Sequence, residues 1–346
     1  MRVIVLGGTG FIGPHVVHRL VEMGHNVAVF NRGRRAAQVE LPPGVERISG
    51  DRDHLSRYAA EFRAFSPDVV LDMRPLSERE ARAVADVFTG IAPRQVAISS
   101  MDVYRIYGRI NGTEPGPPEP LPITEDSPLR EKLYPYRGDT PRADDAPDKW
   151  ADDYDKIPVE RIVMGNPDMP GTVLRLPMVY GPGTMRDFEY VKRMVDGRPA
   201  ILLDERMAEW KSPRGYVGDV AHAIALAVSD ERAAGRVYNV AEPEAYTVRE
   251  WVEQLGQAFG WRGRIVLVPS DLTPASMDPG DVPNHPWVAS SERIRAELGY
   301  AERTPRDVAL RRTVEWQAEH LPTELDAEQF DYGADDRLLA ELEGRG

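Results

Sequence analysis

The sequence of 346 residues contains no cysteine. Disulfide bonds, zinc sites built on thiolates and cysteine nucleophiles are therefore excluded. It also lacks any run close to the ~20 apolar residues that a membrane-spanning helix needs. The first apolar run ends in glycines rather than in a cleavage site, so we expect a cytoplasmic protein without a membrane partner. None of the 7 histidines has metalloprotease spacing, and we expect no metal site.

Positive charge is in the minority. The sequence has 43 Lys and Arg against 56 Asp and Glu, a net charge of -13 at pH 7. Because contacts to nucleic acid phosphates need a basic surface, this balance disfavours nucleic acid as the main partner. The one tight basic cluster is at residues 32–35 (RGRR).

The first stretch of the chain carries the clearest motif. Residues 3–6 are a short apolar run typical of a buried parallel strand, and residues 7–13 read GGTGFIG before an amphipathic helix. Gly7 allows a tight turn, Gly10 lets the backbone approach a pyrophosphate, and Gly13 lets the helix pack on the strand. The pattern predicts a dinucleotide bound at the helix N-terminus. The residues expected to hold it are Gly7, Thr9, Gly10, Phe11, Ile12 and Gly13.

The end of the second predicted strand, residues 26–30, decides the cofactor. NAD usually requires an Asp or Glu here to bind the ribose hydroxyl, whereas this sequence has Asn31 and Arg32, with Arg35 beyond. An arginine fork suits a 2'-phosphate, so we favour NADP, with NAD as the second choice. The alternative is that these arginines belong to a solvated loop.

Strands and helices alternate along the first half of the chain. Strands are predicted at residues 45–49, 68–73, 95–100 and 172–176, and helices at 77–89 and 150–164. This alternation predicts an α/β fold, a Rossmann-type doubly wound parallel sheet whose ligands lie at the carboxyl ends of the strands. Asp51 is expected either to bind the adenine amino group or to cap a helix. Further residues expected at this edge are Arg52, Asp72, Met73, Ser99, Pro177 and Val179.

The predicted domains follow from these patterns. Residues 1–180 form the dinucleotide-binding domain, with a proline-rich loop at 112–148 that we interpret as a long loop or lid. Residues 181–322 form a smaller, mainly substrate-binding lobe. An acidic, loosely ordered tail is expected at 323–346.

The sequence resembles the extended short-chain dehydrogenase/reductase family, the nucleotide-sugar epimerases and dehydratases. The matching segments are residues 7–13 (GGTGFIG), 98–104 (ISSMDVY), Lys156 with Glu160, 175–182 (RLPMVYGP) and 216–220 (YVGDV). Within the family it looks most like an atypical subgroup that contains chloroplast stem-loop RNA-binding proteins. Residues 29–33 (VFNRG) and 50–53 (GDRD) carry that narrower likeness.

The resemblance implies a catalytic Ser, Tyr and Lys. The Tyr phenol exchanges a proton with the substrate, the Lys lowers the phenol pKa and holds the ribose, and the Ser holds the substrate oxygen. Ser100 and Lys156 match the pattern, but Asp152 stands four residues before Lys156, where the family has its tyrosine. The nearest tyrosine, Tyr154, lies two residues before Lys156, about 200° around a regular helix.

Three outcomes are open for this site. The helix could start after Tyr154, so that an irregular entry brings the phenol into the site. Asp152 could serve as the base, or proton transfer could be lost and only cofactor binding kept. For Lys156 and Glu160 the alternative is a surface i, i+4 ion pair.

The leading hypothesis is an NAD(P)-dependent oxidoreductase or epimerase/dehydratase. Its substrate would be a polar, sugar-like or nucleotide-linked small molecule that carries a hydroxyl or a carbonyl. The alternative is a cofactor-binding module without redox turnover, either a sensor or an RNA-binding protein. The family likeness also implies a homodimer, formed through the helices near residues 81–88 and 157–163.

Overall fold

The chain forms two compact units in the computed structural model, which describes residues 1–33, 40–275, 277 and 285–345. The first unit consists of Met1–Val179, Arg214–Pro243 and Ala289–Arg303. The second consists of Tyr180–Pro213, Glu244–Val288 and Thr304–Gly346. The chain therefore returns to the first unit twice after residue 180, which the single boundary predicted there does not anticipate. The returning segments carry a strand and helices that complete the first unit.

The first unit is built on a seven-stranded sheet. Its strands in spatial order are β10 (Val237–Asn239), β6 (Gly171–Leu176), β5 (Arg94–Ser100), β4 (Val69–Asp72), β1 (Arg2–Leu6), β2 (Asn26–Asn31) and β3 (Glu46–Ser49). Every neighbouring pair is parallel. This is the Rossmann order with one strand added beside β6, so the predicted doubly wound parallel sheet is confirmed.

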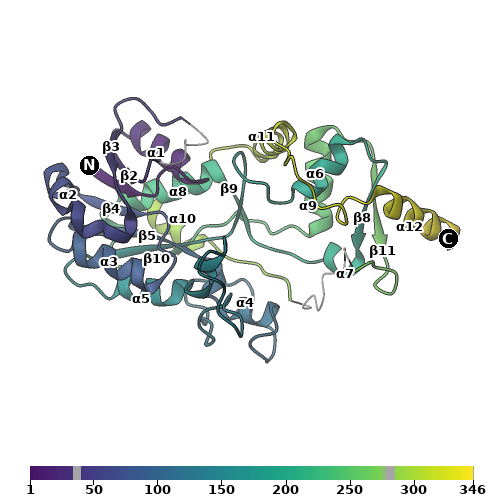
Figure 1. Ribbon diagram of the computed structural model, residues 1–346, viewed down its shortest axis with the longest axis horizontal. Coiled ribbons are helices and arrows are strands. Elements are labelled where there is room, and N and C mark those ends of the chain that lie inside the picture. Colours follow the sequence, from purple (N-terminus) through teal and green to yellow (C-terminus); the bar gives the residue numbers. More distant parts are fainter. Residues whose placement is uncertain (34–39, 276, 278–284, 346) are drawn as a thin grey trace. The chain divides into compact units, whose positions relative to one another are not determined.

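The helices of the first unit alternate with these strands (Figure 1). They are α1 (Gly13–Glu22), α2 (Ala59–Phe65), α3 (Glu78–Phe88), α4 (Arg105–Ile110), α5 (Lys156–Met164), α8 (Val217–Ser229) and α10 (Glu292–Leu298). A short pair is formed by β7 (Met178–Tyr180) and β9 (Arg214–Tyr216). Turns of 3-10 helix occupy Arg52–Tyr58, Met101–Val103, Lys149–Asp152 and Glu231–Ala233. Helix α1 lies against α8, and α3 against α5.

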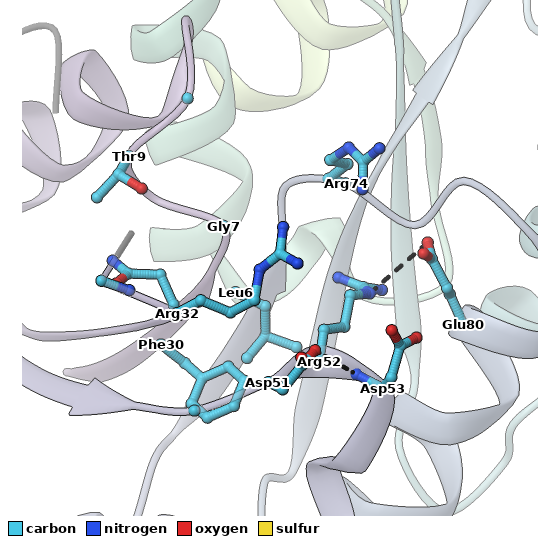
Figure 2. Close-up of a pocket in the computed structure, with 14 residues that line it drawn as sticks. Leu6, Gly7, Thr9, Phe30, Arg32, Asp51, Arg52, Asp53, Arg74 and Glu80 are labelled. Atoms are coloured by element: carbon cyan, nitrogen blue, oxygen red, sulfur yellow. Dashed lines mark hydrogen bonds and ion pairs between the residues drawn. The ribbon is translucent and has the colours of Figure 1, made fainter. Parts of the chain in front are cut away.

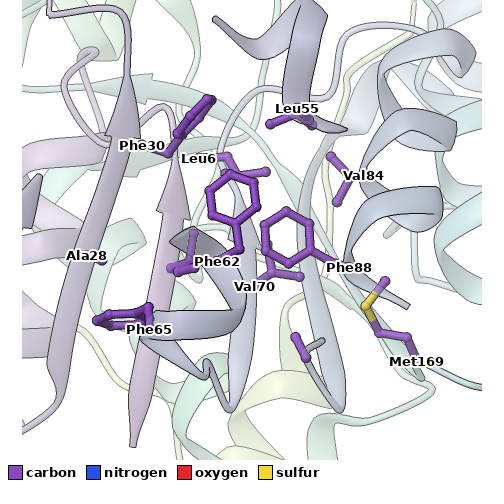
Figure 3. Close-up of a cluster of buried hydrophobic side chains, with 12 residues drawn as sticks. Leu6, Ala28, Phe30, Leu55, Phe62, Phe65, Val70, Val84, Phe88 and Met169 are labelled. Atoms are coloured by element: carbon purple, nitrogen blue, oxygen red, sulfur yellow. The ribbon is translucent and has the colours of Figure 1, made fainter. Parts of the chain in front are cut away.

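A cluster of phenylalanines fills one side of the sheet (Figure 3). The ring of Phe62 on α2 lies 5.3 Å from that of Phe30 on β2 and 4.7 Å from that of Phe88 on α3. The strand residues beneath are equally buried, with Ile4 and Val70 at 0% exposure. Because the sheet is covered in this way, its central strands are continuous apolar runs, the pattern that predicted them.

The predicted strands of the first half are all confirmed, but one helix differs. The pattern predicted a helix over residues 150–164, whereas α5 begins at Lys156 and a separate 3-10 turn covers Lys149–Asp152. The reason is Asp155, whose side chain accepts a hydrogen bond from the Ile157 N–H and caps α5. Tyr154 therefore stands just before the helix rather than within it.

The second unit is smaller and mainly helical. Its elements are α6 (Phe188–Val195), β8 (Ala200–Asp204), α7 (Glu205–Ala208), α9 (Val248–Phe259), β11 (Arg264–Val268), α11 (Arg306–Glu319) and α12 (Tyr332–Arg345). Strands β8 and β11 form a parallel pair.

The end of the chain differs from the loosely ordered tail that we expected, because it contains α12. Asp335 pairs with Arg193 at 3.4 Å, and the Tyr332 hydroxyl donates to Asp196. These contacts fix an acidic segment that has little apolar surface of its own. In the described part of the chain, no helix is long and apolar enough to cross a membrane. The cytoplasmic location stays a prediction.

Candidate functional site

The glycine loop joins β1 to α1 at the carboxyl edge of the sheet. Gly7 has φ +89°, a conformation that favours glycine. A Cβ at Gly13 would lie 2.6 Å from the carbonyl carbon of Gly8, so only glycine lets the helix approach the loop. Gly10 has no neighbouring atom within 4 Å of its would-be Cβ. Thr9 and Gly10 line a cavity, whereas Phe11 and Ile12 are half-buried at the start of α1.

A cavity of about 620 Å³ opens beside this loop (Figure 2). Its volume is typical of a site for a cofactor or a small molecule. The residues that line it are Leu6, Gly7, Thr9, Gly10, Phe30, Asn31, Arg32, Gly33, Gly50, Asp51, Arg52, Asp53, Arg74 and Glu80. Except for Glu80 on α3, they come from the ends of β1, β2, β3 and β4, the edge where the sequence predicted a ligand. These residues fit the adenosine and phosphate end of a dinucleotide.

Arg52, which lines the cavity, forms an ion pair with the buried Asp72. The Arg52 guanidinium donates to both Asp72 carboxylate oxygens, at 2.6 and 2.5 Å, and its Nε lies 3.6 Å from Glu80. The Asp72 side chain is fully buried, and its charge contributes to raising the pKa of Arg52 against the effect of burial. Both carboxylate oxygens of Asp72 are therefore already bound by Arg52. Asp51 caps the following turn by accepting from the Asp53 N–H at 3.1 Å, while it also lines the cavity.

The end of β2 presents a cation to the cavity. Asn31 accepts a hydrogen bond from the Gly33 N–H at 2.8 Å, which shapes the turn that carries Arg32. Figure 2 draws the guanidinium groups of Arg32, Arg52 and Arg74 around the same cavity. Arg35, which we also expected to bind the cofactor, lies outside the described residues. Arg74 was missed, since nothing in the sequence marks an arginine after β4 as a ligand.

Met73 supports the glycine loop, whereas Pro177 and Val179 follow β6. The Met73 N–H donates to the Leu6 carbonyl at 3.0 Å, and its Cβ lies 3.7 Å from the would-be Cβ of Gly7. Pro177 is half-buried directly after β6, and Val179 is buried within β7. None of these three residues lines the described cavity.

The Ser99 hydroxyl points into a buried charge network. It donates to the Glu160 carboxylate at 2.5 Å, and that carboxylate pairs with Arg175 at 2.6 Å. The Arg175 guanidinium in turn donates to the Tyr104 hydroxyl at 2.8 Å. All four side chains are buried. The alternative of a surface ion pair between Lys156 and Glu160 is therefore wrong, because Glu160 is buried against Arg175.

Lys156 is the first residue of α5 and is buried with 5% exposure. Its ammonium donates to the carbonyls of Pro75 at 2.7 Å and Ile98 at 3.1 Å. Burial lowers the pKa of Lys156 to about 8, although the charges of Asp102 and Asp72 oppose the shift. The third ammonium proton has no hydrogen-bond acceptor in the described part of the chain.

Tyr154 lies beside Lys156 in spite of its sequence offset. The Lys156 ammonium is 5.7 Å from the centre of the Tyr154 ring. The phenol donates to Asp102 at 2.8 Å and also hydrogen-bonds with Ser100. Burial, followed by the negative charge of Asp102, raises the pKa of Tyr154 well above its ordinary value. Ser100, Tyr154 and Lys156 thus come together after the end of β5, with Asp102 as an unpredicted fourth member.

Asp152 lies in a different cluster. It receives the Arg142 guanidinium at 2.6 Å and lies 3.6 Å from the Lys149 ammonium. A hydrogen bond from the Arg142 backbone N–H, together with the Arg142 side chain, lowers the pKa of Asp152. A carboxylate held in this way is a poor proton acceptor. The geometry therefore favours the first of the three outcomes, an irregular helix entry that carries Tyr154 into the site.

The comparisons with known proteins agree with this fold. Residues 3–88 match the family described as "NAD dependent epimerase/dehydratase family". The N-terminal part of the chain is thus similar to this family. The matched segment carries the glycine loop and the cavity-lining residues of the first four strands.

Proteins similar to this chain include enzymes that match most of its length. The 2'-dehydrokanamycin reductase of Streptomyces kanamyceticus is 27% identical, over 78% of this chain and 70% of the relative. The structure of a UDP-glucose 4-epimerase from Thermus thermophilus in complex with NAD has a TM-score of 0.65 and 23% identity. It covers 92% of this chain and 99% of the other, and it shows the fold.

The likeness to chloroplast stem-loop RNA-binding proteins also has a counterpart among the relatives. A chloroplast stem-loop binding protein of Arabidopsis thaliana is 22% identical, over 75% of this chain and 64% of the relative. Among the described residues, no group of three His, Asp or Glu side chains is arranged to hold a metal ion.

Proposed function

We propose that this protein is an NADP-dependent oxidoreductase or epimerase/dehydratase that acts on a hydroxyl or carbonyl of a polar, sugar-like or nucleotide-linked small molecule. The observation that supports it most is the meeting of Ser100, Tyr154 and Lys156 after β5. Relatives named as a 2'-dehydrokanamycin reductase and a UDP-glucose 4-epimerase support the substrate class. The excess of negative charge weighs against RNA binding.

Each residue of the proposed site has a defined role. A nicotinamide bound there supplies or accepts the hydride. The Ser100 hydroxyl would hold the substrate oxygen, and the Tyr154 phenol would move its proton. The third ammonium proton of Lys156 would bind a ribose hydroxyl, with the other two protons fixed by the carbonyls of Pro75 and Ile98.

The preference for NADP rests on the cations of the cavity. Arg32 and Arg74 line it, whereas the charge of Arg52 is already matched by Asp72. The end of β2 carries Asn31 rather than the acidic residue that would bind a ribose 2'-hydroxyl. A phosphate held between two guanidinium groups is a strong, charge-assisted contact.

Association of two copies is the second part of the proposal. Helices α3 and α5 pack together over the sheet, and their cluster leaves Ile162 and Met164 partly exposed. We infer a homodimer through this helix pair. Light scattering of the wild type and of Ile162→Glu checks it, and a monomeric wild type would contradict the inference.

The first experiment is to denature freshly purified protein and to identify any released nucleotide by mass spectrometry. Titrations with NADPH and NADH follow, then turnover assays with NADPH and 2'-dehydrokanamycin, and with UDP-glucose as an epimerisation probe. We expect tighter binding of NADPH than of NADH. Retained cofactor together with turnover of UDP-glucose favours an epimerase, and NADPH consumption favours a reductase. Failure to bind either cofactor would overturn the proposal.

Two variants test the site within that assay. Ser100→Ala and Tyr154→Phe should lower turnover by about 100-fold or more, since positioned proton transfer contributes about 10²–10⁴-fold. The dissociation constant of NADPH should change little, because neither hydroxyl lines the cavity. Unchanged turnover of either variant would remove that residue from the mechanism.

A further inference from the structure

Asp102 is a buried carboxylate that the catalytic scheme above does not use. It lies in the 3-10 turn Met101–Val103 directly after Ser100, with 4% exposure. Its Oδ2 accepts the Tyr154 hydroxyl at 2.8 Å and the Tyr136 hydroxyl at 3.2 Å. Its Oδ1 is buried without a hydrogen-bond partner in the described part of the chain.

Among the residues that the structure describes, no cation forms an ion pair with the Asp102 carboxylate. Arg130 lies nearby, but its guanidinium donates to the backbone carbonyls of Asp102 and Lys132 and pairs with Asp155 at 3.1 Å. Lys156 attracts the Asp102 charge, although its ammonium is bound to two backbone carbonyls. A buried carboxylate without an ion pair is costly to keep ionised, so it is a group that readily holds a proton.

The position of Asp102 conflicts with an independent role for Tyr154 as a base. A phenol gives up its proton easily only when positive charge stabilises the phenolate. Here the hydroxyl points at a carboxylate, and two negative charges 2.8 Å apart would repel strongly. Tyr154 therefore keeps its proton whenever Asp102 is ionised.

A path for protons leads away from Asp102. The Tyr136 hydroxyl, which also donates to Asp102, accepts the Tyr107 hydroxyl at 3.0 Å. Tyr107 and Tyr136 are both half-buried, unlike Asp102. The row Tyr154, Asp102, Tyr136, Tyr107 thus runs from the proposed catalytic site toward better-solvated groups.

We propose that Asp102 is a positioning residue that takes and returns the proton passing through the Tyr154 phenol, so that the two groups titrate as one unit. The proposal rests on the proposed function. It assigns the storage of the proton to a carboxylate and leaves the phenol as the group that touches the substrate.

The proton steps balance in either direction. In carbonyl reduction, the hydride from the reduced nicotinamide brings both electrons to the carbonyl carbon, and the carbonyl oxygen forms an O–H bond with the Tyr154 proton. The phenol O–H bond is restored with the proton of the Asp102 carboxyl. The carboxylate then regains a proton from water by way of Tyr136. Oxidation of a hydroxyl reverses every transfer and leaves the proton on Asp102.

The pH dependence follows from this scheme. Burial raises the pKa of Asp102, and the hydrogen bond from Tyr154 and the charges of Arg130 and Lys156 oppose the shift. Reduction requires protonated Asp102, so its rate should fall as the pH rises through that raised pKa. Oxidation requires the carboxylate, so its rate should rise over the same interval.

The first test does not depend on turnover. The protonated carboxyl band of isotope-labelled aspartate is followed against pH by infrared difference spectroscopy in the wild type, Asp102→Asn and Tyr154→Phe. We expect a band that persists above the ordinary pKa of Asp and is absent from Asp102→Asn. Tyr154→Phe should move its midpoint upward, because the variant removes a hydrogen bond to the carboxylate. The absence of such a band, or a midpoint that Tyr154→Phe leaves unchanged, would overturn the proposal.

The second test uses whichever probe the enzyme turns over. Asp102→Asn should lower kcat by about 100-fold and abolish the pH dependence, while KM and NADPH affinity change by no more than about threefold. Asp307→Asn, which removes the same charge from an exposed position on α11, is the matched control. A wild-type pH profile in Asp102→Asn would refute the relay. Failure of every probe in the wild type counts against the proposed function, and the infrared titration still decides on Asp102.

Discussion

Two alanine substitutions in the glycine loop should separate folding from cofactor binding. In Gly13→Ala the new methyl carbon would meet the Gly8 carbonyl carbon at 2.6 Å and its Cα at 2.8 Å. These are backbone atoms, so the loop must move. Overpacking of this kind costs about 1–3 kcal/mol. The gain in helix propensity, ~1 kcal/mol in a helix interior, is small at the first residue of α1.

Gly10→Ala is the matched control. Its methyl group would meet no protein atom within 4 Å, and the φ of Gly10 is not in the left-handed region. We expect the free energy of unfolding to change by no more than ~0.5 kcal/mol. The methyl group would instead stand in the cavity that Gly10 lines, where a pyrophosphate should approach.

Thermal unfolding and NADPH titration measure the two effects. Each kcal/mol shifts Tm by roughly 2–4 °C in a domain of 150–250 residues, so Gly13→Ala should lose several degrees. Gly10→Ala should keep the wild-type Tm and bind NADPH at least about tenfold more weakly, a loss of ~1.4 kcal/mol. Wild-type affinity in Gly10→Ala would refute the assignment of the loop to the cofactor. A wild-type Tm in Gly13→Ala would refute the packing argument.

Three further predictions concern charged groups. Arg32→Ala should weaken NADPH binding by about 10–100-fold in a fluorescence titration, because one charge-assisted hydrogen bond contributes ~1.5–3 kcal/mol. NADH binding should stay unchanged. Equal losses for the two cofactors would exclude a contact between Arg32 and a 2'-phosphate. Arg52→Leu should cost about 3–5 kcal/mol in urea unfolding because it strands the Asp72 carboxylate, whereas Arg79→Leu, at an exposed pair, should cost less than ~1 kcal/mol. Burial lowers the pKa of Lys156 to about 8 from an ordinary 10.5, so the unfolded chain binds the proton more tightly. Wild-type stability should therefore rise relative to Lys156→Met, by at most about 3 kcal/mol, as the pH increases from 8 to 10.5; a constant difference between the two proteins would contradict the buried ammonium.

The sequence predicts those parts of the fold that depend on local pattern. Residues 3–6 and 69–71 are apolar because both faces of their strands are covered, so a simple run identifies them. The glycine loop follows from three backbone requirements within seven residues. Parallel strands end at one edge, which is why the cavity lies where the strand ends predicted it.

The partners of the buried charges could not be predicted in this way. Glu160 follows Lys156 by one helical turn, yet it pairs with Arg175 on β6. Asp102 meets Tyr154 across 52 positions of the chain. Such pairings depend on how the elements pack, and a local pattern contains no information about them.

The start of α5 shows a further limit. Apolar residues extend the helical pattern back to residue 150. The helix itself begins only at Lys156, because Asp155 caps its N-terminus. Asp155 was a visible capping signal, since its type is favoured at helix N-termini. The position of Tyr154 follows from this cap, because Tyr154 precedes Asp155 and therefore does not adopt helical geometry.

The repeated return of the chain to the first unit bears on its folding during synthesis. Strand β10 pairs with β6 at the sheet edge, and α8 lies against α1, although both later elements are made only after residue 216. Until then β6 is an edge strand with unpaired backbone groups, a surface that invites association with other chains. A ribosome-bound chain of 180 residues would thus present an incomplete sheet. The first unit should fold late and as a whole, and deletion of the second unit would require joining three separate segments.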